Sequence, residues 1–464
     1  MTVAVAGASG YVGHKLVESL DADGVSVLAL GRNSAKLPDG DNVRHCPVDV
    51  GDTEALTEVL AGVETAYYLV HAMAGGSDFE EKDRALARSF ADAAAAAGVD
   101  RIVYLGGLGA DELSPHLASR QEVGMLLAET GVPVVELRAA VIIGSGSISF
   151  EMLRYLTERL PVMVCPKWVT TTVQPIAESD LVASLRLAAD QERVGAGVHE
   201  VGGPDVLTYE ELMQLYAKVR GLPRRRVVRV PYLSPGLSSY WVHLVTPVDK
   251  AVSSSLIDSL RNDVVVTQVE SPFTARVSMV EAIEHTLDDQ RERMATDVLD
   301  ADNGVHDGVF TLSTSVDMDP SEAQGARLDL SRCGNNLHWY GWAWAWVLRI
   351  WLGKLFGEKL VLQKPDDVVV GAAVDWWTIA SIDDHHIVLY TDKWFCGEAW
   401  LGYRIDVSTS PELRQVGALR SRGLLGWAYW RAVYPVHLVV FRVMARKQTR
   451  RAHALARAVR DKAA

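Results

Sequence analysis

A glycine motif between a predicted strand and a predicted helix constrains the fold of this chain more than any other feature. Gly7-Ala8-Ser9-Gly10-Tyr11-Val12-Gly13 directly follows the apolar run Val3 to Ala6 and opens a helical pattern. Glycine allows a tight turn and lets the backbone approach a diphosphate closely, and the free N–H groups at a helix N-terminus bind phosphate. The motif predicts a nucleotide site that includes all seven residues. The alternative is a glycine-rich turn without a ligand.

The pattern that follows predicts the fold class. From Thr2 to about Val201, short strand-like runs alternate with helical segments, which indicates a parallel sheet with crossover helices. The predicted strands are Val3 to Ala6, Ser26 to Leu30, Val43 to Cys46, Thr65 to Val70, Arg101 to Leu105, Val134 to Leu137 and Val198 to Val201. We therefore expect an α/β domain of the Rossmann type, with a doubly wound parallel sheet.

The ends of the second, third and fourth strands complete the expected cofactor site. Arg32 follows the second strand, where a guanidinium suits the 2′-phosphate of NADP by charge and geometry. An arginine at this position favours NADP over NAD. The alternative is that Arg32 is a solvated loop residue without a role in binding. Asp49 and Val50 are placed for the adenine. The segment Leu69-Val70-His71 is placed for the adenine-side ribose and the phosphates.

A second domain follows the first. We expect the NAD(P)-binding domain and its substrate-side helices to cover residues 1–290, an acidic linker to cover 291–307, and a further domain to cover 308–464. Alternating apolar residues over 310–318 predict a half-buried strand, and Asp319-Pro320 predicts a helix start. Several strand-like runs and the long helical segment Gly426 to Ala458 then predict an α+β domain with an antiparallel sheet.

Composition excludes several classes of function. The net charge of −13 disfavours nucleic acid as a partner. The four cysteines lie far apart, which argues against a disulfide framework or a structural zinc site, so we expect no metal. The N-terminus lacks the pattern of a signal peptide, and no apolar run reaches the ~20 residues needed to span a bilayer. A cytoplasmic protein is expected, and its oligomeric state stays open.

With these motifs, the chain resembles the atypical, or divergent extended, short-chain dehydrogenase/reductases, and in particular the two-domain YbjT-like bacterial proteins. The resemblance covers nearly the whole chain. It is carried by Gly7 to Gly13, Tyr68-Leu69-Val70-His71, Glu136-Leu137-Arg138-Ala139, Ile143-Gly144-Ser145-Gly146-Ser147, Pro175-Ile176, Val374-Asp375-Trp376-Trp377, Tyr429-Trp430 and Pro435-Val436-His437. The chain is also more distantly similar to the NADPH-binding accessory subunit of respiratory complex I, which holds nucleotide without turning it over.

The resemblance implies a Tyr-x-x-x-Lys pair and an upstream Ser, but this chain departs from that pattern. The matching positions are His116 and Arg120, and the serine position lies in Leu105-Gly106-Gly107-Leu108. His116 and Arg120 lie four residues apart and share one helix face. Ser114-Pro115 looks like a helix start, so the helix N-terminus and the arginine both favour a neutral imidazole. His116 is the candidate proton-handling residue, and the alternative is a structural or phosphate-adjacent role.

The second domain is similar to the helix-grip fold of the START/polyketide-cyclase proteins, whose members enclose an apolar cavity. Its tryptophans either form an ordinary core or line a cavity for a hydrophobic ligand such as a lipid or quinone. They are Trp339, Trp342, Trp344, Trp346, Trp351, Trp376, Trp377, Trp394, Trp400, Trp427 and Trp430. The basic segment Arg442 to Lys462 is either a solvated helix end or a contact with anionic lipid at a membrane surface.

Three functions remain open from the sequence. The first is an NADP-binding oxidoreductase, of short-chain dehydrogenase type, that acts on a small hydrophobic molecule. The second is a non-catalytic dinucleotide sensor or assembly factor, which the missing Ser, Tyr and Lys favour. The third is a hydrophobic-ligand carrier with a regulatory Rossmann domain.

Overall fold

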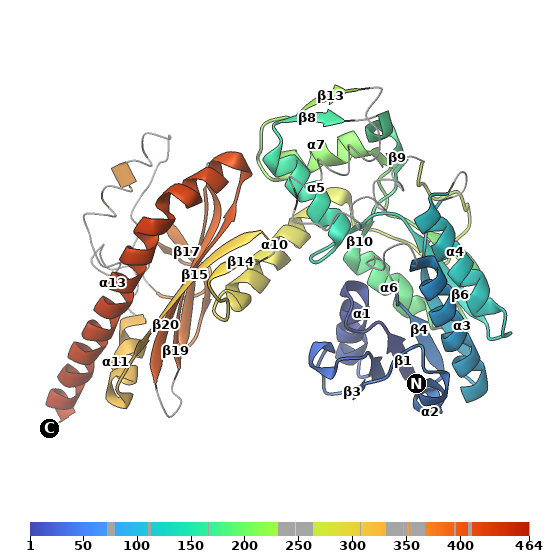
Figure 1. The fold of residues 1–464 in the computed structure, drawn as a ribbon, viewed down its shortest axis with the longest axis horizontal. Coiled ribbons are helices and arrows are strands. Elements are labelled where there is room, and N and C mark those ends of the chain that lie inside the picture. The colour runs from blue at the N-terminus through green and yellow to red at the C-terminus, as the bar shows by residue number, and fades with distance from the viewer. Residues whose placement is uncertain are drawn as a thin grey trace. The chain divides into compact units, whose positions relative to one another are not determined.

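The chain divides into two compact units, Met1–Leu287 and Asp288–Ala464 (Figure 1). The structure, a computed structural model, describes residues 1–71, 79–109, 113–165, 167–230, 246, 263–306, 308–330, 347, 350, 351, 354, 367–393, 396–406 and 411–463. Within these ranges, no helix combines the length and the apolar character that crossing a bilayer requires.

The first unit is an α/β domain. In chain order its elements are β1 (Thr2–Ala6), α1 (Tyr11–Ala22), β2 (Ser26–Leu30), η1 (Ser34–Lys36), β3 (Val43–Cys46), α2 (Thr53–Leu60), β4 (Thr65–Tyr68), α3 (Phe79–Ala97), β5 (Arg101–Gly107), α4 (Pro115–Ala128), β6 (Val134–Ala139), β7 (Ile142–Ile143), α5 (Ile148–Arg159), β8 (Val162–Cys165), η3 (Lys167–Thr170), β9 (Thr172–Val173), β10 (Ile176–Ala177), α6 (Glu178–Ala188), β11 (Gly197–Val201), β12 (Leu207–Thr208), α7 (Tyr209–Val219) and β13 (Arg226–Arg229).

Seven strands form one parallel sheet in the order β11-β6-β5-β4-β1-β2-β3. The seven strands predicted from the sequence are these seven, so the Rossmann-type expectation is confirmed. The strand order reverses between β1 and β4. Ligands of open α/β sheets bind at such a switch point, outside the carboxyl ends of the strands.

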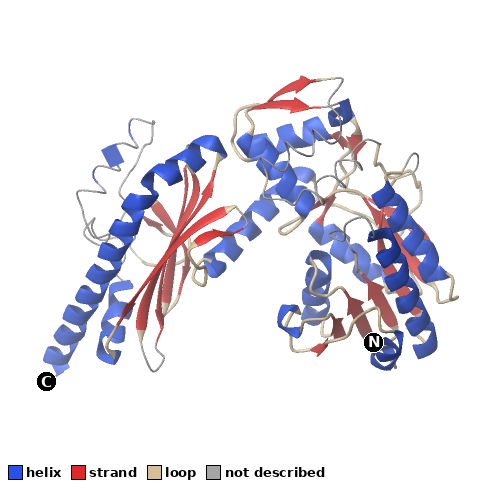
Figure 2. Ribbon diagram, viewed as in Figure 1, coloured by secondary structure: helices blue, strands red, loops and turns tan. Residues whose placement is uncertain are grey.

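Alternate residues of each strand enter two separate cores, one on each face of the sheet. On β1, Ala4 packs with side chains from α2, α3 and α4, whereas Val3 and Val5 pack with side chains from α1 and α6. The ribbon accordingly shows helices on both faces of the sheet (Figure 2). A strand buried on both faces reads as a continuous apolar run, which is why these strands are visible in the sequence.

The second unit is built on an antiparallel sheet. Its elements, together with the helix that enters it, are α10 (Met279–Asp297), β14 (Gly304–His306), β15 (Val309–Asp317), α11 (Pro320–Leu330), β16 (Ala373–Val374), β17 (Trp377–Ile382), β18 (His386–Lys393), β19 (Gly397–Asp406), β20 (Glu412–Ser421) and α13 (Gly423–Ala463). The sheet order is β14-β15-β20-β19-β18-β17-β16. The predicted antiparallel domain is confirmed, and its likeness to the START fold stays a prediction.

The long helix α13 packs on this sheet through large apolar side chains. Trp430, Phe441 and Met444 are buried in the core that the helix shares with the strands. On β20, a Cβ built on Gly417 would lie 2.3 Å from Cε2 of Phe441, so the glycine leaves room for that ring. The aromatic residues of α13 therefore fix how the helix lies on its own sheet.

Two expectations from the sequence need correction. The segment 291–307 is not an irregular linker, because α10 continues to Asp297 and β14 covers Gly304–His306. Residues 368–380, one of the several strand-like runs expected in the second domain, do not form one strand, because Asp375 has a φ of 53° and turns the chain between β16 and β17. The predicted helix start at Asp319-Pro320 is confirmed by α11, where the Asp319 amide donates to Oε2 of Glu322 at 2.9 Å.

Candidate functional site

The glycine motif forms the turn between β1 and α1, and its glycines are sterically required. Gly7 has a φ of 86°, and a Cβ there would lie 2.7 Å from the carbonyl oxygen of Leu69. A Cβ on Gly13 would lie 2.2 Å from the carbonyl oxygen of Gly7. The turn thus packs β1, the end of β4 and α1 closely together. The first amides of α1 lack partners within the helix and point out of its N-terminus, so the turn fits a diphosphate.

The other expected cofactor residues lie at the strand ends. Arg32 is exposed, directly after β2. A Cβ built on the adjacent Gly31 would lie 3.9 Å from Oγ of Ser9, so this strand end lies beside the glycine turn. Asp49 is exposed and its Oδ1 accepts a hydrogen bond from the Gly51 amide at 2.9 Å, while Val50 is buried.

A cavity of about 470 Å³ lies at the carboxyl ends of β1, β4, β5 and β6. Gly10 to Gly13, Leu69 to His71, and both His116 and Arg120 line it. Its apolar lining includes Leu105, Leu108, Ile142, Met152, Leu156 and Met213. The volume falls within the range of about 300–1,000 Å³ that is usual for small-molecule sites, and an apolar wall with few polar groups is typical of them.

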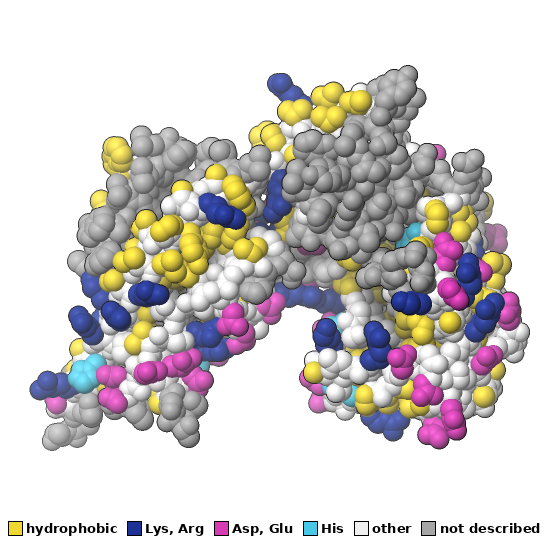
Figure 3. All heavy atoms as spheres, in the orientation of Figure 1, with side chains coloured by type: hydrophobic (Ala, Val, Ile, Leu, Met, Phe, Trp, Pro, Cys, Tyr) yellow, Lys and Arg dark blue, Asp and Glu magenta, His cyan; other side chains and the backbone are white. Residues whose placement is uncertain are grey.

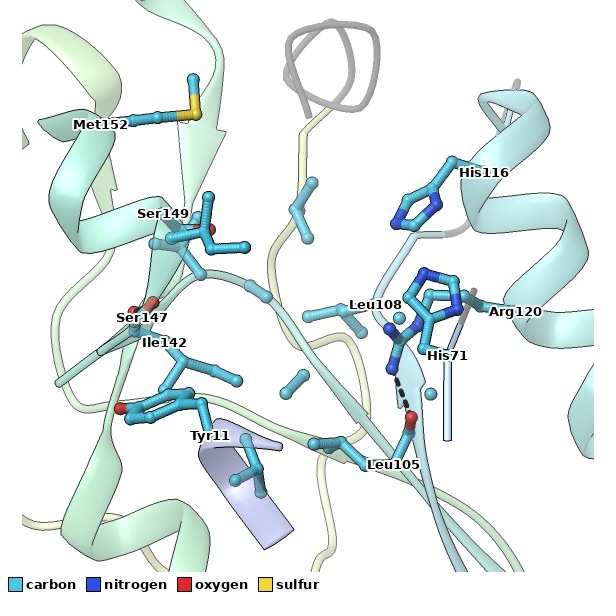
Figure 4. A pocket seen from close by; sticks show the side chains of 18 of the residues that line it. Tyr11, His71, Leu105, Leu108, His116, Arg120, Ile142, Ser147, Ser149 and Met152 are labelled. Carbon is cyan, nitrogen blue, oxygen red and sulfur yellow. Dashed lines mark hydrogen bonds between the residues drawn. The ribbon is translucent and has the colours of Figure 1, made fainter. Parts of the chain in front are cut away.

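The histidine and arginine side chains of the cavity are gathered in one place. Figure 4 shows His71, His116 and Arg120 together on one side, whereas Ile142, Ser149 and Met152 lie across the cavity from them. The ring centroids of His71 and His116 are 4.8 Å apart. The structure thus brings together three predicted site residues that come from two distant segments of the chain.

The start of α4 holds His116, as the sequence predicted. Oγ of Ser114 accepts a hydrogen bond from the Leu117 amide at 3.3 Å, and Pro115 occupies the first helical turn. Burial, the Arg120 guanidinium and the neighbouring His71 lower the pKa of His116 to about 3. His116 is therefore neutral at pH 7, when it is able to donate or accept a hydrogen bond but is a poor acid.

Arg120 is held by the backbone of β5. Its Nη2 donates to the carbonyl oxygen of Leu105, and its own carbonyl accepts a hydrogen bond from the Tyr104 hydroxyl at 2.8 Å. A Cβ on Gly107 would lie 2.6 Å from Cδ2 of Leu117 and 3.5 Å from Cδ of Arg120. A larger residue at this strand position would displace the helix side chains, which explains why glycine stands there.

Two neighbours of the predicted site residues, Asp83 and Glu178, were missed by sequence reasoning. Asp83 on α3 is buried, and its Oδ2 lies 3.3 Å from Nδ1 of His71. Tyr11, within the glycine motif, donates its hydroxyl hydrogen bond to Glu178 of α6. Asp83 carried one detectable signal, a carboxylate on the buried side of an otherwise alanine-rich helix. Among the described residues, no cluster of His, Cys, Asp and Glu fits a metal ion.

The second unit contains a much smaller hollow. Trp376, Trp377, Trp400 and Trp430 contribute to the lining of a space of about 80 Å³. This volume suits a few water molecules and is far below the usual ligand pocket. Of the predicted aromatic stripes, Trp339, Trp342, Trp344, Trp346 and Trp394 lie outside the described residues, and Trp351 is exposed.

The outer face of α13 carries exposed apolar side chains. Trp427, Val436 and Val439 are 45%, 59% and 51% exposed, and Figure 3 shows hydrophobic side chains gathered along this part of the second unit. Arg442 and Arg446 are exposed further along the helix. Contact of this helix with anionic lipid stays a prediction, which sedimentation with anionic vesicles would test.

Comparison with known proteins supports the nucleotide site. Residues 7–131 match the family described as NAD(P)H-binding, and residues 306–444 match a protein family of unknown function, DUF2867. The match to an NAD(P)H-binding family thus falls on the segment that holds the glycine motif. The matched segment contains the glycine motif, β2 to β5 and α4, and it includes the ends of β4 and β5 that line the cavity.

Two curated relatives and one solved structure show what the chain is similar to. Over 246 residues it is 26% identical to NADH dehydrogenase [ubiquinone] 1 alpha subcomplex subunit 9, mitochondrial, of Arabidopsis thaliana, covering 49% of this chain and 60% of that protein. Over 143 residues it is 34% identical to Quinone oxidoreductase 2 of Escherichia coli, covering 29% and 47%. The chain thus spans less than two thirds of either relative.

The fold of the first unit also has a solved counterpart. MoeE5, in complex with UDP-glucuronic acid and NAD, superposes with a TM-score of 0.51 at 20% identity, covering 63% of this chain and all of that one. The expected resemblance is confirmed as an NAD(P)H-binding match over residues 7–131 and a Rossmann-type fold of the first unit. The comparisons do not distinguish NADP from NAD.

Proposed function

We propose that this protein is an NADP(H)-dependent oxidoreductase that acts on a small apolar carbonyl compound, with quinones as the favoured class. One observation carries the proposal: an apolar cavity opens at the glycine turn, and its histidine and arginine side chains, His71, His116 and Arg120, gather on one side as a polar corner. An apolar cavity with such a corner fits a hydrophobic molecule that places a carbonyl oxygen there.

The residues around the glycine turn fit a dinucleotide. The narrow space between Gly7, Leu69 and Gly13 admits no side chain, and the first amides of α1 provide hydrogen-bond donors for the diphosphate. Arg32 would bind the 2′-phosphate through charge-assisted hydrogen bonds. The bound nicotinamide would supply or accept a hydride.

The polar corner would hold the oxygen of the substrate. His116 is neutral at pH 7 and donates a hydrogen bond without carrying charge. Arg120, anchored to the Leu105 carbonyl, adds a fixed positive charge that stabilises a developing oxyanion. A quinone suits this arrangement because its reduced oxygen is a weak base, so the site needs no strong acid in place of the missing Tyr and Lys.

Nucleotide binding and turnover test the proposal together. We expect tighter binding of NADPH than of NADH by titration calorimetry, and oxidation of NADPH when menadione or decylubiquinone is added. In Arg32→Ala, NADPH affinity should fall by about tenfold or more while NADH affinity stays unchanged, since a charge-assisted hydrogen bond contributes roughly 1.5–3 kcal/mol. Arg193→Ala, at an exposed loop arginine, is the matched control.

A second candidate is a protein that holds nucleotide without turning it over. The observation that favours it is the His116 and Arg120 pair at the positions where the related enzymes have Tyr and Lys. In that case NADPH would bind with the same preference, and no carbonyl compound of the panel would accelerate its oxidation.

A further inference from the structure

His71 has a buried partner on one ring nitrogen and an open site on the other. Its Nδ1 lies 3.3 Å from Oδ2 of Asp83, and the two side chains are 16% and 3% exposed. Its Nε2 is buried and forms no hydrogen bond within the described part of the chain. The 3.3 Å contact is longer than an optimal N–H···O bond, and such bonds often tighten only when substrate binds.

This pairing sets the tautomer of the imidazole. An ionised carboxylate only accepts hydrogen bonds, so Nδ1 of His71 carries the proton when it faces Asp83. The lone pair of the neutral ring then lies on Nε2. His71 lines the cavity, and its ring lies against that of His116 beside Arg120 (Figure 4).

We propose that His71 is the residue that exchanges a proton with the substrate and that Asp83 is its positioning residue. In oxidation, the O–H bond of an alcohol breaks and its proton forms a bond with Nε2, while the hydride from the carbon passes to the oxidised nicotinamide, leaving a carbonyl. In reduction of a quinone, Nε2 of His71 would first take up a proton from water. The bound nicotinamide would supply a hydride to the quinone, one quinone oxygen would gain the proton from Nε2, and a hydroquinone would form. This inference rests on the proposed hydride transfer and assigns the acid–base role within it.

The charges around His71 support a neutral resting state. Burial is the main influence that lowers the pKa of His71, and Arg120 acts in the same direction, whereas Asp83 opposes them. The described titratable groups that face the ring are Asp83 from α3, His116 and Arg120 from α4, with Tyr104 of β5 near Asp83. A proton taken up by His71 is stabilised by the paired Asp83 carboxylate, whereas the same carboxylate is the weakest of the influences on the pKa of His116.

The division of roles follows from this difference. His116 lies next to two groups that disfavour its charged form, Arg120 and His71. It is suited to donate a hydrogen bond from its neutral ring. His71 is the imidazole with a carboxylate behind it, which is the arrangement that lets a histidine accept and return a proton.

Three variants test the assignment in the full-length protein. With NADPH and menadione, His71→Ala should lower kcat by about 100-fold or more, while the Kd for NADPH stays within about twofold of the wild type. Asp83→Asn should lower kcat by about tenfold or more through the altered tautomer. Because Asp83 raises the pKa of His71, the part of the kcat pH profile that follows the titration of His71 should also move to lower pH in Asp83→Asn. His14→Ala, an exposed histidine paired with Glu18, should change nothing.

The outcomes separate this inference from the proposed function. If His71→Ala keeps its kcat and binds NADPH more weakly, His71 only contacts the cofactor. That result would overturn the inference and leave the proposed hydride transfer in place. If the wild type oxidises no NADPH with any acceptor, the proposed function fails. The ¹⁵N chemical shifts of His71 still test its pairing with Asp83, because they show which ring nitrogen carries the proton. A proton on Nδ1 that redistributes in Asp83→Asn supports the pairing. A proton on Nε2 in the wild type overturns it.

Discussion

Two glycines, Gly7 and Gly13, shape the turn where we predict that the first unit binds a dinucleotide. The space between Gly13 and the Gly7 carbonyl and the space between Gly7 and the Leu69 carbonyl are too small for a methyl group. Both contacts involve backbone atoms, which cannot rotate away as a flexible side chain does. The same atoms that pack α1 on β1 therefore also form the predicted phosphate site.

Gly13→Ala is expected to reduce nucleotide affinity and stability together. The new Cβ would lie 2.2 Å from the Gly7 oxygen, so α1 must move away from the turn. We expect the Kd for NADPH to rise by at least about tenfold and the protein to lose about 1–3 kcal/mol of unfolding free energy. Gly195→Ala is the control, because a Cβ at Gly195 meets no atom within 4 Å. Equal NADPH affinity in both variants would contradict the assignment of the turn.

The depressed pKa of His116 predicts how stability depends on pH. The folded chain holds this pKa at about 3, whereas in the unfolded chain it is about 6.5. Between these values only the unfolded chain binds the proton, so stability falls as the pH decreases below about 6.5, by up to about 1.4 kcal/mol per pH unit. Above that pH this histidine contributes no pH dependence.

His116→Gln removes this dependence. Between pH 7.5 and pH 5, urea unfolding should show a loss of stability that is smaller in His116→Gln than in the wild type by about 2 kcal/mol. His14→Gln replaces an exposed histidine and should follow the wild type. A parallel pH dependence in all three proteins would show that His116 titrates normally in the folded chain.

The sequence predicted the individual residues of the site better than their pairing. The glycine turn, the Ser114 cap and the neutral state of His116 were visible because each depends on neighbours in the chain. Asp83 was missed because its partner, His71, belongs to a different segment, and only the packing of α3 beside the end of β4 joins them. A contact between distant segments leaves little trace in the spacing of either one.

At the scale of elements, α10 shows why an acidic segment was mistaken for a linker. Its buried positions follow helical spacing, from Met279, Ala282 and Ile283 to Ala295. Two further buried positions on this face, Thr286 and Gln290, are polar, so the apolar period disappears from the sequence. The acidic residues cover much of the remaining face. The strands at the centre of the parallel sheet, such as β1, β4 and β5, are buried on both sides and gave no such difficulty.

A pair of matched substitutions tests this account of α10. Val298, directly after the helix, is fully buried in a core with Ala295 and Tyr390, whereas Val280 is 39% exposed. Val298→Ala should cost about 2 kcal/mol of unfolding free energy, because two buried methyl groups and their contacts are lost. Val280→Ala should cost less than about 0.5 kcal/mol. Equal effects in urea unfolding would restore the linker interpretation.

At the scale of the whole molecule, the two units have separate cores and different contents. Among the residues that the structure describes, three buried clusters lie within the first unit and two lie within the second, and no buried residue belongs to clusters of both. The cavity that is large enough for a ligand lies in the first unit. Nucleotide binding should therefore raise the free energy of unfolding of the first unit. The free energy of unfolding of the second unit should stay unchanged.

Tryptophan fluorescence separates the two units, because eleven of the thirteen tryptophans lie beyond residue 307. Saturating NADPH, at about 100 times its Kd, should add about 2.7 kcal/mol to the unfolding free energy of the unit that binds it. We expect calorimetry to show one transition that moves to higher temperature with NADPH, while the tryptophan-detected transition stays in place. Gly13→Ala should abolish the shift, and Gly195→Ala should keep it. If NADPH moved the tryptophan-detected transition as far as the calorimetric one, the two cores would unfold as one cooperative unit.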